Sequence, residues 1–516
     1  MTIRTIDKRF PRISIAHSFV ETIRAYRHAN DRIAELVIRL EAIWLKTETQ
    51  VTALRNARRH TYQRLLQFHE ECLRRLTARF YAASAEIETF IEAPIKDLNL
   101  AQLSIQHGPM KKLRYSLFEN HLQKTIDDLE AWHAVFDPSW FLITLHSNSN
   151  IDTELAAMYP NSTQGQQDIN AVAAIRTVIQ ETRNKSVTGS VFRDAGFVTL
   201  YRETLPHSSL SISALATGST RAILDTTTYP EEVDKSQTTS HVRDLARILF
   251  CSQPSTLGLL QCVGVLKELD ANGNLSQYTF VFLDPTKPPA ATSSLRALLL
   301  RGPVSLDAKY RIAKSLARGA LAVHAADFVH KSIRPDNIIV FSNSKDQDMK
   351  AYLVGFERTR PAAAGTTLSG DRIWERNLYR HPSRRGLKPE HAYIMQHDIY
   401  SLGVCLLEIG LWDSLVVPSE PPKPGRLLHI EEQLSMGTSL ETAWEIKKIL
   451  IHMAQTFLPN LMGLLYTEVV LSCLTCLDSN TTNTFVNNED LYDEDGILIG
   501  VTFIEQILSR LETISI

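Results

Sequence analysis

Cysteine is scarce in this sequence, which has six cysteines among 516 residues. Four of them stand far apart, unlike the dense framework that crosslinks small secreted domains: Cys72, Cys251, Cys262 and Cys405. Cys473 and Cys476 form a CxxC pair with no second pair and no nearby histidine ligands, so core packing explains it better than metal or redox chemistry. We therefore expect a reducing, intracellular compartment and no metal site.

Net charge is also small. Lysine and arginine number 55 against 57 for aspartate and glutamate, which leaves a formal charge of -2 and no overall basic field that would favour a nucleic-acid partner. The first residues carry scattered charges and lack the apolar core of a signal peptide. No stretch approaches the roughly 18 to 20 apolar residues of a membrane-spanning helix. These absences predict a cytoplasmic protein without a nucleic-acid partner.

The first third of the chain has a helical pattern. Residues 17–92 contain no glycine or proline, and apolar residues recur at heptad-like spacing, as at Tyr26, Ile33 and Leu40. Further apolar stripes run through Leu65–Phe90 and Leu122–Trp132. The pattern predicts an all-helical bundle of three or four helices over residues 1–145, with coiled-coil character, followed by a linker and connecting helix over 146–189.

After Gly189 the pattern changes to short runs of alternating apolar and polar residues, separated by glycine and proline. The runs FVTLYRETL, SLSISALA, TRAILDTTTY and YTFVFLD predict strands of one antiparallel sheet within residues 190–300. Mainly helical sequence follows over 301–516, including the apolar run IYSLGVCLLEIGLW. The fold class is therefore α+β, with an all-α N-terminal bundle, a strand-rich region and a helical region.

The segment FVHKSIRPDNIIVF resembles the catalytic loop of protein kinases, in which a His-Arg-Asp pattern is followed by an asparagine. His330 and Asn337 occupy the histidine and asparagine positions. Ser332 occupies the position of the aspartate that accepts the proton of the substrate hydroxyl. A neutral hydroxyl cannot act as that base, and general-base catalysis contributes about 100-fold to 10,000-fold.

Other kinase motifs are altered or retained in order. Gly355, Phe356 and Glu357 stand where the metal-binding Asp-Phe-Gly would be, so the magnesium-binding carboxylate is missing. No G-x-G-x-x-G precedes them, and TRAILDTTTY has Asp225 or Thr227 near the place of the phosphate-binding lysine. HDIYSLG resembles a D-x-W-S-x-G helix, in which the aspartate would bond to the catalytic-loop backbone and the glycine would permit close packing; these are Asp398 and Gly403.

The resemblance implies a bilobal kinase-like fold, with an antiparallel β N-lobe at 190–300 and a mainly α C-lobe at 301–516. Because the catalytic aspartates are replaced, we predict a pseudokinase that is not an enzyme and has no cofactor, since neither ATP nor magnesium finds its usual ligands. The Gly-Phe-Glu triplet behind a helical bundle is similar to mixed-lineage kinase domain-like pseudokinases. It also resembles fungal proteins that join a HeLo-type bundle to a degenerate kinase domain.

The resemblance to these families implies a signalling protein whose kinase-like domain gates an effector bundle, in fungal programmed cell death. It implies protein partners, homo-oligomers, an upstream kinase, and recruitment to an anionic membrane through the bundle. Candidate phosphorylation sites lie in the expected activation segment: Thr359, Thr366, Thr367 and Ser369. Candidate lipid-binding residues are the bundle arginines Arg24, Arg27, Arg32, Arg39, Arg58 and Arg59.

Two other hypotheses stay open. In the first, both domains bind only proteins, and the heptad stripes make the bundle a dimerisation element of a scaffold without membrane activity. In the second, the chain is an active kinase of unusual chemistry that uses Asp336 or Asp225 in roles the kinase pattern does not assign.

Overall fold

A computed structural model gives the fold of the chain. It describes residues 13–24, 31–57, 63–92, 109–146, 175–178, 190–218, 220–228, 235–252, 257–269, 275–342, 349–356, 359–361, 373–385, 392–430, 440–478, 485 and 497–514. The chain divides into two compact units, Met1–Ile169 and Asn170–Ile516.

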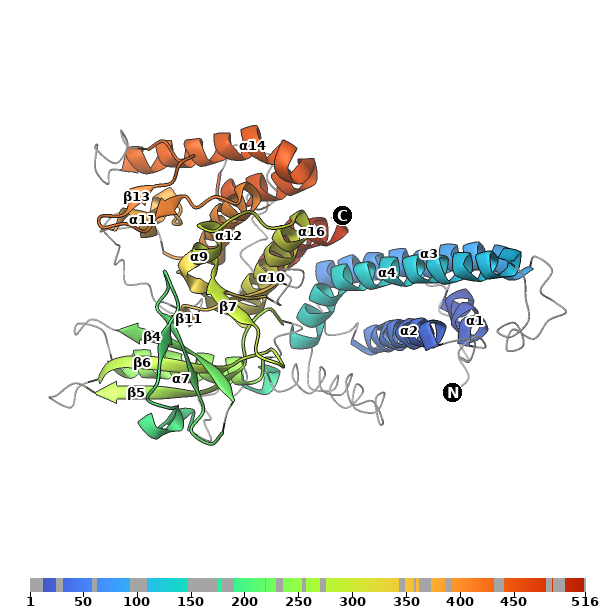
Figure 1. Ribbon diagram of the computed structural model, residues 1–516, viewed down its shortest axis with the longest axis horizontal. Coiled ribbons are helices and arrows are strands. Elements are labelled where there is room, and N and C mark those ends of the chain that lie inside the picture. The colour runs from blue at the N-terminus through green and yellow to red at the C-terminus, as the bar shows by residue number, and fades with distance from the viewer. Residues whose placement is uncertain are drawn as a thin grey trace. The chain divides into compact units, whose positions relative to one another are not determined.

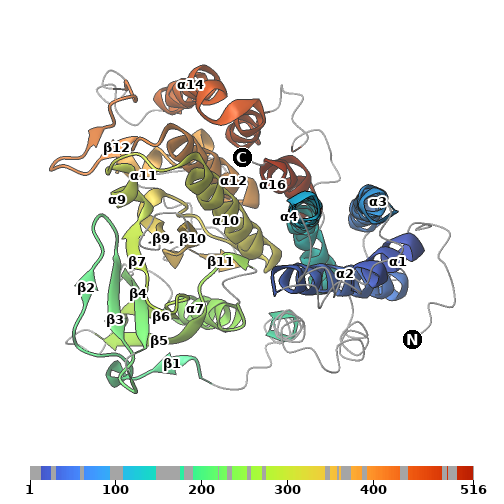
Figure 2. The ribbon, with the colours of Figure 1, turned by 45° about the vertical axis from the view of Figure 1, so that its right-hand side comes forward.

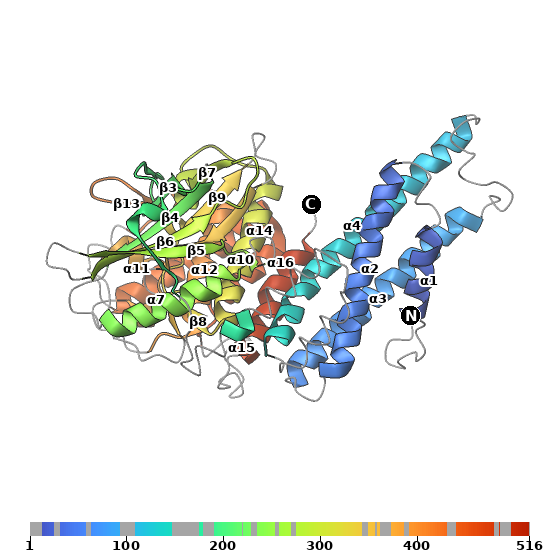
Figure 3. The ribbon, with the colours of Figure 1, turned by 90° about the horizontal axis from the view of Figure 1, so that it is seen from below.

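The N-terminal unit is helical in its described part. Its helices are α1 (Ile13–Arg24), α2 (Asp31–Ala57), α3 (Gln63–Glu92) and α4 (Pro109–His146). Helix α4 packs against α2 and α3, and α1 packs against α2 and α3 (Figure 3). The apolar stripes meet in a core that includes Ile33, Leu40, Leu73, Leu76, Phe80, Leu122 and Ile126. The prediction of helices in this region is confirmed.

A six-stranded sheet opens the second unit (Figure 1), with strand order β1-β5-β6-β4-β3-β2. Neighbouring strands are antiparallel except for the parallel pair β1 and β5. The bounds are β1 (Phe192–Arg193), β2 (Glu203–Thr204), β3 (Leu210–Ala214), β4 (Arg221–Thr228), β5 (Cys262–Leu269) and β6 (Leu275–Leu283). The chain is therefore a mixed α+β protein, with helices first and a sheet later, as predicted.

One predicted strand is largely wrong. The run FVTLYRETL contains the end of the short helix η2 (Ala195–Phe197), an isolated bridge from Val198 to Leu215 and the two residues of β2. Between them Leu200 is 99% exposed and Tyr201 is 74% exposed. Alternation of apolar and polar residues predicted one face turned to the core, but these two apolar residues bulge away from the sheet edge instead.

The two faces of strand β4 have different surroundings. Ala222 and Leu224 form a buried cluster with Leu266 of β5 and Val281 of β6. Successive side chains of a strand point to opposite faces, so Asp225 faces the other way. Helix α7 (Lys235–Phe250) packs against β5. The sheet therefore holds a buried carboxylate, 1% exposed, on the face opposite this apolar cluster.

Smaller strands and helices follow the sheet. The strands are β7 (Ala291–Ser294), β8 (Phe328–Val329), β9 (Ile338–Ser342), β10 (Met349–Leu353), β11 (Arg360–Pro361), β12 (Val416–Val417) and β13 (Lys423–Pro424). The helices are α9 (Leu295–Leu299), α10 (Leu306–Ala325), η3 (Pro335–Asn337), α11 (Trp374–Asn377), η5 (Pro382–Arg384), α12 (Met395–Leu411), α14 (Leu440–Leu474), α15 (Ile497–Phe503), η7 (Ile504–Leu508) and α16 (Ser509–Thr513). Strand β10 packs beside α10 (Figure 2).

Helix α14 bears on the expectation that no segment could span a membrane. Within the described residues, Glu441–Leu474 is long and apolar enough to cross a membrane by length and composition, so that expectation was too strict. The core helix of a soluble protein passes the same test, and 44% of the most apolar window is buried here. Gly463, with a positive φ of 79°, interrupts the helix four residues after Pro459.

Candidate functional site

Asp398 lies in the first turn of α12 and is fully buried. Its carboxylate accepts hydrogen bonds from the backbone N–H groups of His330 and Lys331, at 2.7 and 2.8 Å. The Tyr393 hydroxyl donates to it at 2.6 Å. Burial alone would raise the pKa of Asp398, but His324, His330 and the Tyr393 hydroxyl together outweigh burial and lower it. A charged Asp398 thus fixes the start of the His330–Asn337 loop, the contact that the resemblance implies.

The same loop holds Ser332 and Asn337 against each other. The Asn337 side-chain amide donates to the Ser332 carbonyl oxygen at 2.8 Å and to Ser332 Oγ at 3.0 Å. The Arg334 guanidinium also donates to Ser332 Oγ. Ser332 is only 6% exposed. Its hydroxyl oxygen is therefore already occupied as an acceptor by two donors of its own loop.

Gly355 sits directly against Asn337. Its φ is +79°, a conformation that side-chain-bearing residues rarely adopt, and a Cβ built there would lie 2.2 Å from Asn337 Cγ. The backbone N–H groups of Gly355 and Phe356 donate to one carboxylate oxygen of Asp225, at 2.8 and 3.2 Å. The buried carboxylate of β4 therefore fixes the segment in which the kinase pattern would place a metal-binding aspartate.

Phe356 links the sheet to the loop through aromatic contacts. Its ring centroid lies 5.0 Å from that of His330, 6.3 Å from Phe280 and 6.1 Å from Phe282. His330 is fully buried, and its Nε2 lies 3.0 Å from the Val354 carbonyl oxygen. The strand-rich and helical regions are therefore joined through a continuous buried contact.

A second buried network contacts the His330–Asn337 loop through Asp336. Arg296 of α9 is 2% exposed and donates to Glu408 of α12 at 2.9 Å and to the Tyr379 hydroxyl at 2.7 Å. It also donates to Asp336 at 3.2 Å. Tyr379 in turn donates to Glu408 at 2.9 Å. The Arg296 guanidinium of α9 therefore connects the His330–Asn337 loop to α12 and to Tyr379.

The carboxylates of this network differ in proton affinity. Burial raises the pKa of Glu408 above its ordinary value. Burial acts on Asp336 in the same direction, but the charges of Arg296 and Arg334 outweigh it and lower the pKa of Asp336. The Asp336 side chain is 32% exposed. It is thus a charged, weakly basic carboxylate within reach of solvent.

Magnesium finds a poor set of ligands among the described residues. Magnesium prefers carboxylate oxygens, but Gly355 offers none. The Asn337 amide nitrogen is bonded to Ser332, so only one amide oxygen of Asn337 is left as a neutral ligand. Asp336 is paired with Arg296. Among the residues that the structure describes, no group of three histidine, cysteine or acidic side chains is arranged to hold a metal. The arrangement does not fit a metal–nucleotide pair bound in the usual kinase manner.

The remaining predicted residues fall into two groups. Gly403 lies where α12 meets α14, and a Cβ there would be 2.6 Å from Cys473 Cβ, so only glycine permits this approach. The Thr359 hydroxyl donates to the His330 carbonyl oxygen at 3.3 Å. Four predicted residues lie outside the described residues: Glu357, Thr366, Thr367 and Ser369.

Sequence reasoning missed Arg296 and its partners. Glu408 belongs to the apolar run IYSLGVCLLEIGLW, but its role as a partner of Arg296, like that of Tyr379, could not be read from spacing. Arg296 lies 112 residues before Glu408. A charged residue within the apolar run LRALLL was the available signal, since buried charges are retained in pairs.

Comparison with known proteins adds distant relatives. The chain is 27% identical over 165 residues to a Dictyostelium discoideum protein named "Probable serine/threonine-protein kinase", a match that covers 32% of this chain and 9% of that protein. It is 32% identical over 117 residues to serine/threonine-protein kinase PknL of Mycobacterium tuberculosis, over 22% of this chain and 27% of PknL. No protein-family model matches the chain. These partial matches support a kinase-like domain.

The comparison also corrects one prediction. The sequence predicted a protein that is not an enzyme, because Ser332 and Gly355 replace two catalytic aspartates. The relatives are named as serine/threonine kinases, which contradicts that prediction. Replacement of residues at two motif positions describes the site, but it does not by itself establish the absence of phosphoryl transfer.

Proposed function

We propose that the chain is a signalling protein whose kinase-like domain restrains an N-terminal helical effector bundle. In this proposal the second unit has a bilobal protein-kinase fold, with an N-lobe at 190–300 and a C-lobe at 301–516. Support comes from the order of the motifs and from Asp398, which accepts two backbone N–H bonds from the loop that resembles a catalytic loop. The helical unit precedes this domain in the same chain.

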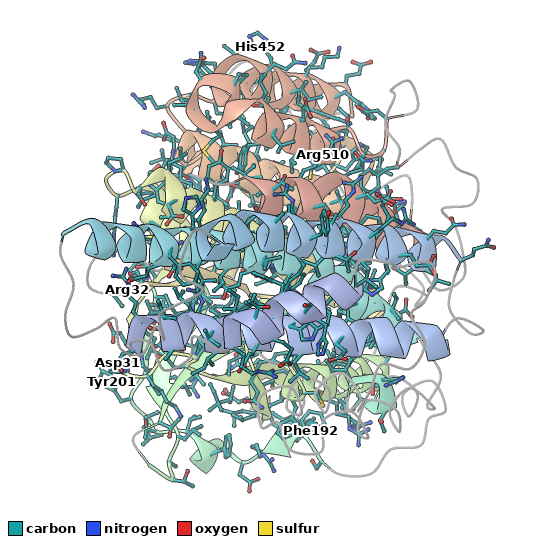
Figure 4. All side chains as sticks on the ribbon, turned by 90° about the vertical axis from the view of Figure 1, so that its right-hand side faces the viewer. Asp31, Arg32, Phe192, Tyr201, His452 and Arg510 are labelled. Atoms are coloured by element: carbon teal, nitrogen blue, oxygen red, sulfur yellow. The ribbon has the colours of Figure 1, made fainter. Side chains whose placement is uncertain are left out.

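The observation that carries the proposal is the pairing of the bundle's basic residues. Arg24 of α1 pairs with Glu41 of α2, and Arg32, in the first turn of α2 (Figure 4), pairs with Glu119 of α4 at 2.8 Å. Arg39 of α2 donates to both Asp127 and Glu130 of α4, at 2.8 and 2.7 Å. Arg27, Arg58 and Arg59 lie outside the residues whose side chains are described.

These ion pairs connect different helices, so separating the helices releases the arginines. A released arginine adds about 1 kcal/mol of attraction to an anionic lipid surface. The closed bundle therefore keeps Arg24, Arg32 and Arg39 paired with carboxylates, and an opened bundle presents them together with its apolar core. This is the behaviour expected of a restrained membrane effector of the HeLo type in fungal cell death, recruited from the cytoplasm.

Dye release from liposomes tests the proposal. The unit Met1–Ile169 and the full chain are compared at matched concentration on anionic liposomes, with neutral phosphatidylcholine liposomes as the control. We expect leakage from the isolated unit on anionic liposomes and little from the full chain. Absence of dye release by both preparations would exclude the effector function.

A second candidate function is that of a protein scaffold, which two exposed apolar residues of α2 favour. Ile38 and Leu45 lie seven residues apart on α2 and are 50% and 44% exposed. Heptad spacing of exposed apolar residues is typical of a self-association face. Replacing both by lysine would then convert an oligomer to a monomer in sedimentation experiments without any effect on liposomes.

Phosphoryl transfer is the activity suggested by the relatives' names. Asp336 is the carboxylate to test as proton acceptor, because it is partly exposed while Asp225 is buried and bonded to backbone N–H groups. Asp336→Asn should abolish transfer to a general protein substrate, and Asp307→Asn, an exposed carboxylate of α10, serves as the control. We also propose weak binding of magnesium–ATP, measured by calorimetry, because the usual carboxylate ligand is replaced by Gly355.

Regulation by an upstream kinase is proposed at Thr359, Thr366, Thr367 and Ser369. Thr359 donates its hydroxyl hydrogen to the His330 carbonyl oxygen, so a phosphate there would lose this bond and add negative charge beside the loop. Mass spectrometry of the protein from stimulated cells tests these positions. Absence of phosphate at all four residues would exclude this form of regulation.

A further inference from the structure

The turn between β2 and β3 bonds directly to the loop that carries Asp336. Ser208, in this turn, donates its hydroxyl hydrogen to the backbone carbonyl oxygen of Asp336 at 2.9 Å, across 128 residues of sequence. From the other side, Ser294 at the end of β7 donates its hydroxyl hydrogen to the carbonyl oxygen of Pro206 at 2.7 Å. Two side-chain hydrogen bonds therefore tie the turn to separate segments.

Hydrogen bonds within the turn restrict its conformation. The Leu205 N–H donates to the Leu210 carbonyl oxygen at 2.9 Å, which closes the turn, and Leu205 is 3% exposed. His207 has a positive φ of 54°, and Ser208 Oγ accepts the N–H of Leu210 at 3.2 Å. The turn sequence Leu-Pro-His-Ser-Ser contains no glycine, so its conformation is more restricted than that of a glycine-rich loop.

The position of the β2–β3 turn among the early strands bears on the role of its contact with Asp336. In protein kinases a glycine-rich loop between the early strands covers the phosphates of the nucleotide, above the catalytic loop. Here the β2–β3 turn precedes β4, which carries Asp225, and it contacts the His330–Asn337 loop directly. Ser208 therefore bonds to the His330–Asn337 loop, and Asp225 bonds to the separate Gly355–Phe356 segment.

We propose that the β2–β3 turn is a latch that holds the six-stranded sheet to the His330–Asn337 loop. The sheet moves away from this loop only after the Ser208–Asp336 and Ser294–Pro206 bonds open. The latch lies wholly within the second unit, and it does not depend on the proposed action of the bundle on membranes.

Ser209 provides a matched control for Ser208. The two serines are adjacent in the turn, but Ser209 is exposed whereas Ser208 is half-buried. Ser208→Ala removes the donor to Asp336, and Ser208→Asp also places a negative charge beside the Asp336 carbonyl oxygen. Ser209→Ala and Ser209→Asp change the composition and charge of the turn in the same way without changing the donor.

Hydrogen exchange of the full chain measures how often the turn and the loop to which it bonds open. In Ser208→Ala we expect about fivefold faster exchange in peptides covering 203–212 and 330–342, the change produced by the loss of one hydrogen bond of about 1 kcal/mol. Ser208→Asp should give a larger increase, and the Ser209 variants should match the wild type. Faster exchange in the turn peptide alone would show a local role of Ser208 and overturn the latch. An unchanged pattern in both peptides would overturn it as well.

Discussion

The two units of this protein place their charges in different environments. In the helical unit, ion pairs lie at the surface, as between Arg79 and Asp128, whose side chains are 47% and 46% exposed. In the second unit, Arg296 and Glu408 are 2% and 0% exposed. Exposed pairs contribute about 0 to 1 kcal/mol, whereas removal of one partner from a buried pair costs about 3 to 5 kcal/mol. The Arg79–Asp128 pair of the helical unit is therefore easily exchanged, whereas the Arg296–Glu408 pair of the second unit is not.

The largest expected effect tests this difference directly. Arg296→Met leaves Glu408 buried without its cation, so we expect the free energy of unfolding of the second unit to fall by about 3 to 5 kcal/mol. Arg79→Met, the matched change in an exposed pair, should lower the stability of the helical unit by less than about 1 kcal/mol. Urea denaturation, followed by hydrogen exchange in each unit, measures both.

A similar cost for the two arginine variants would contradict the comparison. The double variant Arg296→Met with Glu408→Gln adds a check, because it removes the buried negative charge left by the single change. Part of the lost stability should return in the double variant. No recovery would mean that Arg296 acts through packing and Tyr379 rather than through its charge.

The next effect concerns the close approach of Gly355 to Asn337. Gly355→Ala places a Cβ 2.2 Å from Asn337 Cγ at a positive φ, so we expect a loss of about 2 to 4 kcal/mol in the free energy of unfolding. Gly196→Ala is the control, because no atom lies within 4 Å of a Cβ there. Stability in urea measures both variants, and equal stability would show that the loop moves away freely.

Acidification should affect the helical unit through its buried histidines. His69 is fully buried and stacks on Trp140, and burial lowers its pKa well below 6.5. Burial likewise lowers the pKa of His133, which lies 2.8 Å from Thr47 Oγ1, although Asp137 opposes this change. The unfolded chain therefore binds protons that the folded bundle does not, so stability present above about pH 6.5 is lost as the pH falls toward the folded pKa.

Each buried histidine should cost about 1.4 kcal/mol per pH unit within that window. Hydrogen exchange of α3 and α4 between pH 7.5 and 5 measures the loss. His69→Phe, which retains an aromatic ring beside Trp140, should flatten the profile, whereas His452→Phe at an exposed position should leave it unchanged. A wild-type profile that is flat over this range would mean that the histidines bind protons equally in the folded and unfolded chain, and would contradict the lowered pKa values.

The sequence predicted the elements whose signal is local. Helices without glycine or proline and the alternating strands β4 and β6 follow from periodicity, because each residue needs only its neighbours to show the pattern. Leu200 and Tyr201 are exceptions, because they are exposed at the sheet edge although the alternating pattern predicted a strand. The pairing of Asp225 with Gly355 and of Arg296 with Glu408 could not be predicted, because these residues lie 130 and 112 positions apart and meet only in the tertiary fold.

The motif positions were informative in a different way. Ser332, Asn337 and Gly355 could be placed by resemblance, and the structure brings them into direct contact. What their contacts do for chemistry did not follow from the residue types. Ser208 had no motif at all, and only its bond to the Asp336 carbonyl oxygen gives it a role.

The smallest effect separates stability from function in the helical unit. Asp127→Asn with Glu130→Gln frees Arg39, whereas Arg39→Met removes it; both changes break the same pairs between α2 and α4 and should cost about 1 kcal/mol or less. If freed arginines bind anionic lipid, only the first variant of Met1–Ile169 should release liposome dye faster than the wild type. Equal acceleration by both variants would mean that loosening of the bundle, and not the arginine charge, drives leakage, so the ion pairs would act only as restraints.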